Sequence, residues 1–258
     1  MRAAWVVVCG VLAVAGVVLT SLSAAGDGPA PVGWTVAADV AAATPAGPVA
    51  VAPEPPIGPA ELSLAGTEPS PLRAAPAWVD RVSMATGIGP VAIRAYGAAT
   101  LTLARDRSGC RLGWPTLAAI GAVESGHGTH GGAVLLDDGR PSIPVIGPAL
   151  DGSHGTAAIR AGTDDAAWHG DAVWAHAVGP MQFLPSTWRR WASDGDGDGV
   201  LDPNDLDDAA LAAGRYLCAS GADLTTSDGW QAAVRSYNHD DAYVALVLAT
   251  ANGYAGQS

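Results

Sequence analysis

The sequence predicts a mainly α-helical domain over residues 77–258, preceded by an apolar N-terminal segment and a proline-rich linker. Two observations predict this class. From residue 77 onward, apolar residues recur at the spacing of amphipathic helices, and several of these segments begin at a proline. In addition, 49% of the 258 residues are hydrophobic, which is enough to build a sizeable core and excludes general disorder.

The charge of the chain is strongly acidic. The sequence has 25 acidic and 13 basic residues, a net charge of −12, and every base is an arginine. Because there is no block of basic residues, we expect no binding to nucleic acid or to an anionic membrane surface. Of the four glutamates, only Glu124 lies outside the proline-rich linker.

The first 25 residues predict export from the cytoplasm. No charged residue occurs between residues 3 and 25, and Arg2 precedes this run. Residues 1–25 are therefore expected to be a signal peptide, with small residues at 23–25 for cleavage, or a retained membrane anchor. Either outcome places the domain outside the cytoplasm, secreted or held at the outer face of the cytoplasmic membrane.

Residues 26–76 predict a disordered linker. They hold eleven of the nineteen prolines and are otherwise rich in alanine, valine and glycine. Proline favours extended backbone without a hydrogen-bond ladder, so this segment suits a spacer in front of the domain.

The two cysteines beyond the N-terminal segment, Cys110 and Cys218, are expected to form a disulfide. An even pair in an exported chain is more often oxidised than left as two buried thiols. Closing so long a loop stabilises the fold by about 4 to 5 kcal/mol in the chain-entropy model.

The domain begins with the most regular helical patterns. Residues 77–85 predict a short helix, and residues 90–105 predict a longer one with one buried face. Residues 115–124 are almost wholly apolar, which is typical of a helix inside a core. Further helices are expected at 185–191, 208–219, 229–237 and 241–252, the last ending at Gly253. The glycine-rich segment 126–175 between them is too long for a plain connection, which favours a functional loop or short strands.

Glu124 is the first candidate for chemistry. It ends the apolar helix 115–124, so its carboxyl is expected to lie against an apolar wall. Burial disfavours the charged form and raises the pKa, as a general acid near neutral pH requires. The alternative is an ordinary solvated glutamate at a helix end.

A second candidate is the segment 179–188, which contains the only phenylalanine, Phe183, together with Met181 and Gln182. A buried turn that starts the next helix explains the aromatic residues but gives Gln182 no task. An amide in a cleft is suited to hydrogen-bonding sugar hydroxyls or acetamido groups.

A third candidate is an acidic loop at 194–205 with the spacing of an EF-hand, including a glycine at its sixth position. Clustered carboxylates repel one another unless a cation neutralises them, so the loop predicts a structural Ca²⁺ site. Its twelfth residue is an aspartate instead of the usual glutamate, which leaves the affinity open. The expected ligands are Asp194, Asp196, Asp198, the carbonyl of Val200, Asp202 and Asp205.

Two motifs together resemble a known family: Ala-Ile-Gly-Ala-Val-Glu-Ser-Gly-His-Gly at 119–128 and Ala-Val-Gly-Pro-Met-Gln-Phe-Leu-Pro-Ser-Thr-Trp at 177–188. They are similar to the lytic murein transglycosylases of the membrane-bound B type, with the actinobacterial branch as the best fit. The resemblance extends from about residue 77 to 254. It implies a lysozyme-like domain that cleaves the β-1,4 bond between N-acetylmuramic acid and N-acetylglucosamine in peptidoglycan, and a calcium loop in this position.

The resemblance also implies roles for individual residues. Glu124 would be the sole acid and base, and the product would carry a 1,6-anhydromuramoyl end. The residues expected to bind substrate are Ser125, Met181, Gln182, Phe183, Tyr237 and Asn238. We expect a monomer that acts on glycan strands in cell-wall remodelling without an organic cofactor.

Two other functions remain open from the sequence. An aspartate of the segment 126–175 would make the protein a hydrolytic muramidase that uses water and two carboxyls. A protein of the same fold without catalysis would be a peptidoglycan-binding module.

Overall fold

The computed structural model describes residues 72–153 and 156–257. Within these ranges the fold is helical, and the only β-structure consists of isolated bridges between single residues. The main helices are α1 (Pro76–Thr86), α2 (Pro90–Asp106), α3 (Trp114–Ser125), α5 (Pro185–Trp191), α6 (Leu206–Ser220), α7 (Ser227–Tyr237) and α8 (Asp241–Ala255). The mainly α class is thereby confirmed for the described part of the chain.

Every helix expected from the sequence is present, and the differences lie at the ends. Helix α6 begins at Leu206, before the expected start at 208. Asp205 caps it there by accepting a hydrogen bond from the Asp207 backbone amide. The prediction that Gly253 stops α8 is wrong, since the helix continues to Ala255. Two short elements were not expected, the 3₁₀ turn η2 (His130–Gly132) and α4 (Ala166–His169).

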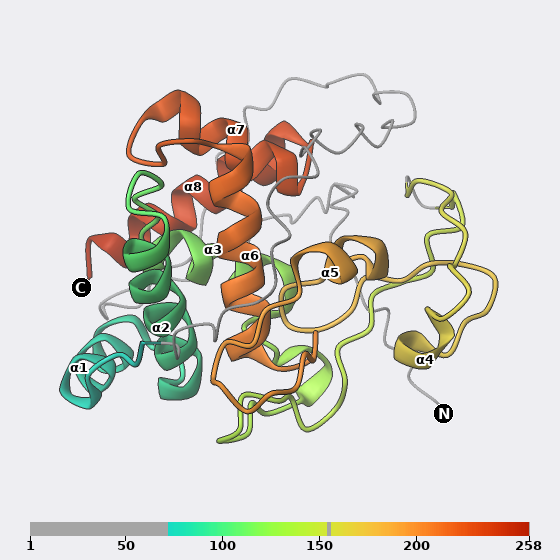
Figure 1. The fold of residues 1–258 in the computed structure, drawn as a ribbon, viewed down its shortest axis with the longest axis horizontal. Coiled ribbons are helices and arrows are strands. Elements are labelled where there is room, and N and C mark those ends of the chain that lie inside the picture. The colour runs from blue at the N-terminus through green and yellow to red at the C-terminus, as the bar shows by residue number, and fades with distance from the viewer. Residues whose placement is uncertain (1–71, 154–155, 258) are drawn as a thin grey trace, which may run out of the picture.

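The core forms where α2 packs along α6 and where α3 packs along α8 (Figure 1). Tyr96 of α2 is fully buried and lies against α3 at Gly121. A Cβ atom added at Gly121 would come within 2.0 Å of the Tyr96 hydroxyl, so only glycine permits this close approach. This packing fixes the position of α3 and of Glu124 in its last turn.

The disulfide between Cys110 and Cys218 is present, as predicted. It ties the connection between α2 and α3 to the last turn of α6, and the two residues are 108 positions apart in sequence. Arg111 forms an ion pair with Asp223 next to it, so two cross-links hold this end of the domain.

The segment 148–178 projects from the helices as a separate lobe on the right of Figure 1. Bridges between Asp151 and Ala158 and between Arg160 and Trp174 fold it back on itself, and α4 places Trp168 beneath Arg189 of α5. The predicted signal or anchor (1–25) and nearly all of the predicted linker (26–76) lie outside the described residues. In the ranges that are described, none of the helices has the length and apolar character needed to span a bilayer.

Candidate active site

Glu124 lies in the last turn of α3, where the helix stops abruptly. Gly126 adopts a left-handed conformation with φ of 59°, and its amide donates back to the carbonyl of Ala122. The His127 amide donates to the carbonyl of Gly121 in the same way, which completes a glycine-type helix end. The chain therefore turns away from Glu124 immediately after it and leaves part of its surface accessible.

The carboxyl of Glu124 has the electrostatic character of a general acid. Burial among apolar atoms raises its pKa from 4.5 to about 7, although a hydrogen bond from Tyr243 acts in the opposite direction. The Tyr243 hydroxyl donates to Oε1 of Glu124 at 2.6 Å. With Oε1 engaged as an acceptor, the proton of the neutral acid belongs on Oε2.

The sequence analysis did not predict Tyr243 as part of this site. It lies in the first turn of α8 and is itself buried, and the nearby charge of Glu124 contributes to raising its pKa. An aromatic residue in an apolar helix looks like ordinary core in the sequence. Only the packing of α8 against α3 brings its hydroxyl to Glu124.

Tyr237, at the end of α7, reaches the same region. Its hydroxyl donates to the carbonyl of Met181 at 2.7 Å, and burial together with the charge of Glu124 raises its pKa. Tyr237 thus connects the turn around Met181 to the surroundings of Glu124.

Ser125, the next residue after Glu124, links the end of α3 to the same turn. Its hydroxyl donates to the carbonyl of Pro180 at 2.6 Å and accepts a hydrogen bond from the amide of Gly128. Ser125 and Met181 are 0% exposed and Phe183 is 3% exposed. These three side chains support the site from within the core in this conformation.

Gln182 and Asn238 use their side chains locally. Gln182 has a left-handed backbone with φ of 50°, and its amide nitrogen donates to the carbonyl of Gly179 at 3.0 Å. Asn238 ends α7 and accepts a hydrogen bond from the amide of Asp240. Both residues are partly exposed, and no hydrogen bond joins either side chain to Glu124 within the described residues.

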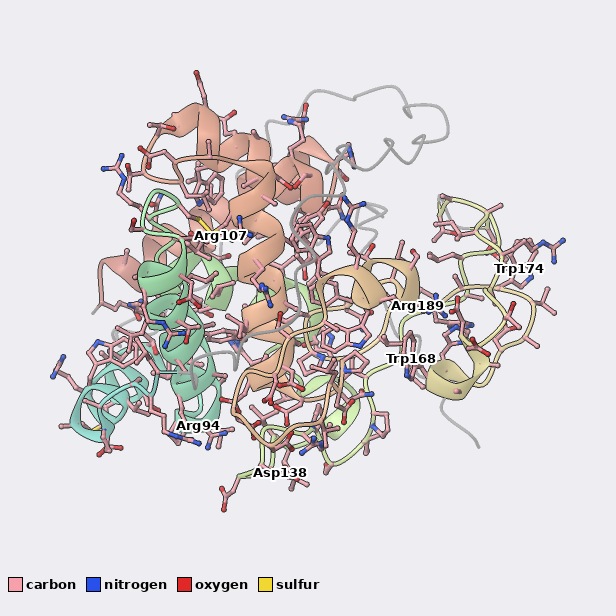
Figure 2. The ribbon with its side chains drawn as sticks, viewed as in Figure 1. Arg94, Arg107, Asp138, Trp168, Trp174 and Arg189 are labelled. Atoms are coloured by element: carbon pink, nitrogen blue, oxygen red, sulfur yellow. A yellow bond between two sulfur atoms is a disulfide. The ribbon has the colours of Figure 1, made fainter. Side chains whose placement is uncertain are left out.

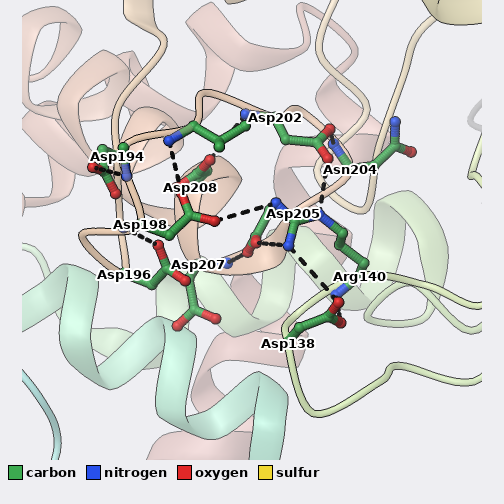
Figure 3. A network of polar contacts seen from close by, with 12 residues as sticks. Asp138, Arg140, Asp194, Asp196, Asp198, Asp202, Asn204, Asp205, Asp207 and Asp208 are labelled. Carbon is green, nitrogen blue, oxygen red and sulfur yellow. Dashed lines mark hydrogen bonds and ion pairs between the residues drawn. The ribbon is translucent and has the colours of Figure 1, made fainter.

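The predicted metal loop folds as a tight acidic turn (Figure 3). The carboxylate of Asp194 accepts hydrogen bonds from the amides of Gly197 and Gly199, which have left-handed backbones. Two groups of carboxylate oxygens converge within 4.8 Å, and oxygen atoms are the kind of ligand that a hard cation takes. The groups are Asp194, Asp196 and Asp208, and Asp196, Asp198 and Asp205.

Asp208 is a member of this cluster that the loop pattern did not include. It lies in α6, three residues past the end of the EF-hand spacing, and accepts hydrogen bonds from the amides of Gly195 and Asp202. It therefore holds together the two ends of the loop. The carboxylate of Asp202, also an expected ligand, lies outside both convergent groups.

Arg140 provides positive charge at this cluster. Its guanidinium lies 3.0 Å from Asp202, 3.2 Å from Asp205 and 3.6 Å from Asp198 (Figure 3). Oδ2 of Asp205 is buried, and the charged group beside it is Nη1 of Arg140 at 3.2 Å. A buried carboxylate oxygen of this kind fits a cation ligand.

The metal loop and the acid are connected through one glycine. Gly179 starts the turn that contains Met181, and its φ of 77° requires glycine. A Cβ atom there would lie 1.7 Å from the carbonyl oxygen of Pro203 in the metal loop. Since the next residue, Pro180, holds Ser125, the loop supports the turn on which the surroundings of Glu124 rest.

The two best-defined cavities in the described ranges are not lined by Glu124. One, of about 240 Å³, lies between the α1–α2 junction, the turn at 126–129 and Tyr254. The other, of about 200 Å³, lies between the projecting lobe and α5.

One comparison with known families gives a match, and it covers the second half of the domain. Residues 162–250 match the Transglycosylase SLT domain. The matched stretch includes the turn with Gln182, the metal loop, Tyr237 and Tyr243, and it begins after Glu124. The SLT match supports the lytic transglycosylase, lysozyme-like family and, in general terms, action on peptidoglycan outside the cytoplasm. Searches of curated proteins and of solved structures found no match.

Proposed function

We propose that the protein is a peptidoglycan lytic transglycosylase of the membrane-bound B type, in its actinobacterial branch. It cleaves the β-1,4 bond between N-acetylmuramic acid and N-acetylglucosamine and leaves a 1,6-anhydromuramoyl end. The observation that carries the proposal is Glu124, a carboxyl whose pKa burial raises to about 7, in a domain whose residues 162–250 match the transglycosylase family.

The chemistry requires a group that is an acid first and a base afterwards. Neutral Glu124 donates the Oε2 proton to the glycosidic oxygen as the bond to C1 of the muramic acid breaks. The sugar's own 2-acetamido oxygen stabilises the positive charge that develops at C1. The Glu124 carboxylate then takes the proton from the 6-hydroxyl, and O6 bonds to C1. The proton is returned to Glu124, and no water is consumed.

A pKa near 7 serves both steps, because neither protonation state is strongly favoured at neutral pH. Tyr243 holds Oε1 and so fixes which oxygen faces the substrate. It also stabilises the carboxylate form in which Glu124 acts as a base.

The surroundings of Glu124 favour the lyase over a hydrolytic muramidase of the retaining type. A retaining glycosidase places its second carboxyl about 5 Å from the first, where the two charges influence each other strongly. Among the described residues, the influences on the Glu124 pKa are burial and Tyr243, without another carboxylate. The aspartates of segment 126–175 are therefore not close partners of Glu124.

The acidic loop is proposed to bind a structural Ca²⁺ through Asp194, Asp196, Asp198 and Asp205, with Asp208 as an added carboxylate. A bound cation would neutralise the clustered charges, and its effect on the acid would be indirect. Gly179 and Pro180 would transmit the ordered position of the loop to Ser125.

The setting of the enzyme follows from its N-terminal sequence. Export places it in contact with glycan strands, either as a secreted monomer or anchored at the outer face of the cytoplasmic membrane. Its role there is cell-wall remodelling.

Product analysis of digested cell wall tests the function. The purified wild type is expected to release fragments with 1,6-anhydro ends, whereas a muramidase releases reducing ends. Glu124→Gln keeps the shape but cannot donate a proton, so cleavage should fall by roughly 10²- to 10⁴-fold or more. Asp80→Asn, which removes an exposed carboxyl on α1, serves as the matched control.

Each unexpected outcome has a defined meaning. Reducing ends in the wild-type digest would show a hydrolase, and undiminished cleavage by Glu124→Gln would remove Glu124 from its role. A wild type that binds cell wall and never cleaves it would be a binding module.

A further inference from the structure

The projecting lobe joins the rest of the domain through two short backbone segments, 145–147 and 177–179. They lie side by side, since the amide of Gly147 donates to the carbonyl of Ala177 at 2.8 Å. The second segment continues directly into the turn that contains Gln182. The base of the lobe and part of the candidate site therefore belong to one unit of backbone.

Gln182 has a backbone conformation that a residue with a side chain rarely adopts. Its φ of 50° lies in the left-handed region, and such a conformation persists only where the surroundings hold it. Its side-chain nitrogen donates to the carbonyl of Gly179, and its Oε1 lies against Gly147. A Cβ atom added at Gly147 would come within 2.7 Å of this Oε1. The position of Gly147 therefore limits where the Gln182 amide can lie.

His176 binds Gly147 through its ring. Nδ1 of His176 lies 2.7 Å from the carbonyl oxygen of Gly147, and Nε2 lies 3.2 Å from Oδ2 of Asp171. A carbonyl and an ionised carboxylate can only accept, whereas a neutral imidazole has a single N–H group to donate. Only the charged imidazolium donates to both partners at once. A neutral ring would leave a lone pair facing either the carbonyl or the carboxylate.

Asp171 keeps its negative charge wherever a histidine changes charge. Hydrogen bonds from the amides of Val173 and Trp174, together with the contact to His176, lower the pKa of Asp171 to about 2. Its own amide donates to Nδ1 of His169 at 3.2 Å. Asp171 is therefore a fixed acceptor, and the proton count at this contact depends on His176.

His169 of α4 is the other titratable group against His176, and the two rings are 4.8 Å apart. Burial lowers the pKa of His169 and the charge of His176 acts in the same direction, although the carboxylates of Asp165 and Asp171 oppose them. His169 is therefore suited to stay neutral beside a charged His176. The positive charge of the ring pair belongs to His176.

A second contact anchors the lobe to α5. Arg189 lies over the ring of Trp168 and forms an ion pair with Asp165 (Figure 2). Because Trp168 directly precedes His169 in α4, this contact keeps α4 in place when the charge of His176 changes. The change is therefore expected at the base of the lobe and not across the whole lobe.

We infer that His176 is a positioning residue for Gln182. The charged ring clamps the carbonyl of Gly147 to Asp171, and Gly147 in turn holds the Gln182 amide in the conformation that binds substrate. The clamp is complete at mildly acidic pH and loses one of its two hydrogen bonds as the ring loses its charge, which for histidine occurs between about pH 5 and 8. The inference rests on the proposed function, since it concerns an amide expected to bind the glycan.

Two substitutions hold the clamp in one state each. An arginine donates from several N–H groups at every pH, so His176→Arg should keep both contacts. A glutamine side chain has no charge, so His176→Gln should behave as the neutral form throughout. The measurement is kcat and KM of the full chain on soluble glycan strands, from about pH 5.5 to about pH 8. Because the proteins are compared at the same pH, the titration of Glu124 cancels.

The expected result is a crossover in KM. At the acidic end the wild type should match His176→Arg, and at the alkaline end it should match His176→Gln. The KM values of the two variants should differ about three- to tenfold with similar kcat, because a charge-assisted hydrogen bond that positions a binding group is lost. His130→Arg and His130→Gln, at an exposed histidine of η2, are the matched controls and should both follow the wild type.

Gly147→Ala tests the second link of the chain. The added Cβ displaces the Gln182 amide and leaves His176 unchanged, and the backbone of Gly147 is not left-handed, so alanine is compatible with it. Its KM should rise already at the acidic end, where the clamp is complete. Gly109→Ala, at an exposed glycine whose Cβ would meet open space, should leave KM unchanged.

Hydrogen exchange gives a readout that needs no catalysis. The Gly147 amide, which donates to Ala177, reports on the pairing at the base of the lobe. Its protection factor should fall toward alkaline pH in the wild type and stay constant in His176→Arg.

The results that overturn the inference differ from those that overturn the function. Equal KM values of His176→Arg and His176→Gln, a wild type that follows one variant at every pH, or losses confined to kcat exclude the clamp. An unchanged KM in Gly147→Ala removes the link to Gln182 and overturns the inference as well. If the wild type cleaves no glycan, the proposed function fails, and retention of the strands by the same proteins at the two ends of the pH range decides the clamp.

Discussion

Glu124, which is half-buried, and Asp205, which is fully buried, are carboxyls of the same domain, but the charges around them differ. Burial raises the pKa of Glu124 to about 7, and Tyr243 is its only polar partner among the residues described. Burial also raises the pKa of Asp205 to about 6, but there the carboxylates of Asp207 and Asp196 add to the effect and Arg140 opposes it. One region isolates a single carboxyl, while the other concentrates several.

The difference shows which ligand each region is suited to. A carboxyl whose pKa is raised by burial alone stays neutral until a substrate accepts its proton, so it is suited to proton transfer. Carboxylates whose pKa values are raised partly by one another's charge lose their protons when a cation binds, so they are suited to binding a metal. A cation should therefore act strongly on the loop and only indirectly on Glu124.

The largest expected effect comes from calcium at the acidic loop. At a free concentration of about 100 times the dissociation constant, binding to the folded state alone raises the free energy of unfolding by about 3 kcal/mol. For a domain of this size the melting temperature should rise by about 5 to 10 °C. Thermal melts of the full chain with Ca²⁺ and with excess chelator measure the difference.

Two variants locate this effect. Asp198→Asn, at an exposed position of the loop, should abolish most of the calcium response. Asp138→Asn also changes a carboxyl facing Arg140 but lies outside the loop, and it should keep the response. Equal melting temperatures of the wild type with calcium and with chelator would contradict the metal site.

The next effect concerns the stability of the acid site itself. A carboxyl with a pKa of 4.5 in the unfolded chain and about 7 in the folded state binds more protons when folded. The free energy of unfolding therefore falls as the pH rises from about 4.5 to 7 and stays low above that range. Glu124→Gln removes this loss, and above pH 7 the variant should be more stable than the wild type by on the order of 1 to 3 kcal/mol.

Denaturant unfolding at several pH values measures this difference. The gain in stability from Glu124→Gln should shrink toward zero near pH 4.5, and Asp80→Asn should show no such trend. A constant gain at all pH values would indicate a change in packing, and a loss at pH 8 would show that Glu124 is not a strained carboxyl. Calcium should raise the melting temperature of the wild type and of Glu124→Gln equally, because it is proposed to bind at the acidic loop and not at Glu124.

The helices and the pairing of distant segments were predictable from the sequence for physical reasons. Proline at the first turn of α2, α3 and α5 and the apolar run of α3 determine local structure directly. The disulfide followed from the number of cysteines and the expectation that the chain is exported. The end of α8 was predicted wrongly, because Gly253 stays within the helix and the chain does not turn there.

The site was predictable only where the residue type is itself unusual. Glu124 was visible as a lone glutamate after an apolar run, but Tyr243 is an aromatic residue in an apolar helix and depends on how α8 packs. Asp208 was missed because it lies beyond the loop spacing and joins the cluster through the fold of α6. Burial of Ser125 and Met181 likewise depends on long-range packing that sequence periodicity does not contain.

The smallest effect concerns the hydrogen bond that distinguishes Glu124 from an ordinary buried acid. Tyr243 donates to Oε1 and lowers the Glu124 pKa, so Tyr243→Phe should raise that pKa above its present value of about 7. Because the acid must be protonated to start cleavage, the alkaline limb of the pH–rate profile should move upward by about half to one unit. Tyr254→Phe removes a hydroxyl from the same helix, next to His127 and not to Glu124, and should leave the limb in place. A limb that stays fixed in Tyr243→Phe, or moves to lower pH, would mean that burial alone determines the acidity of Glu124.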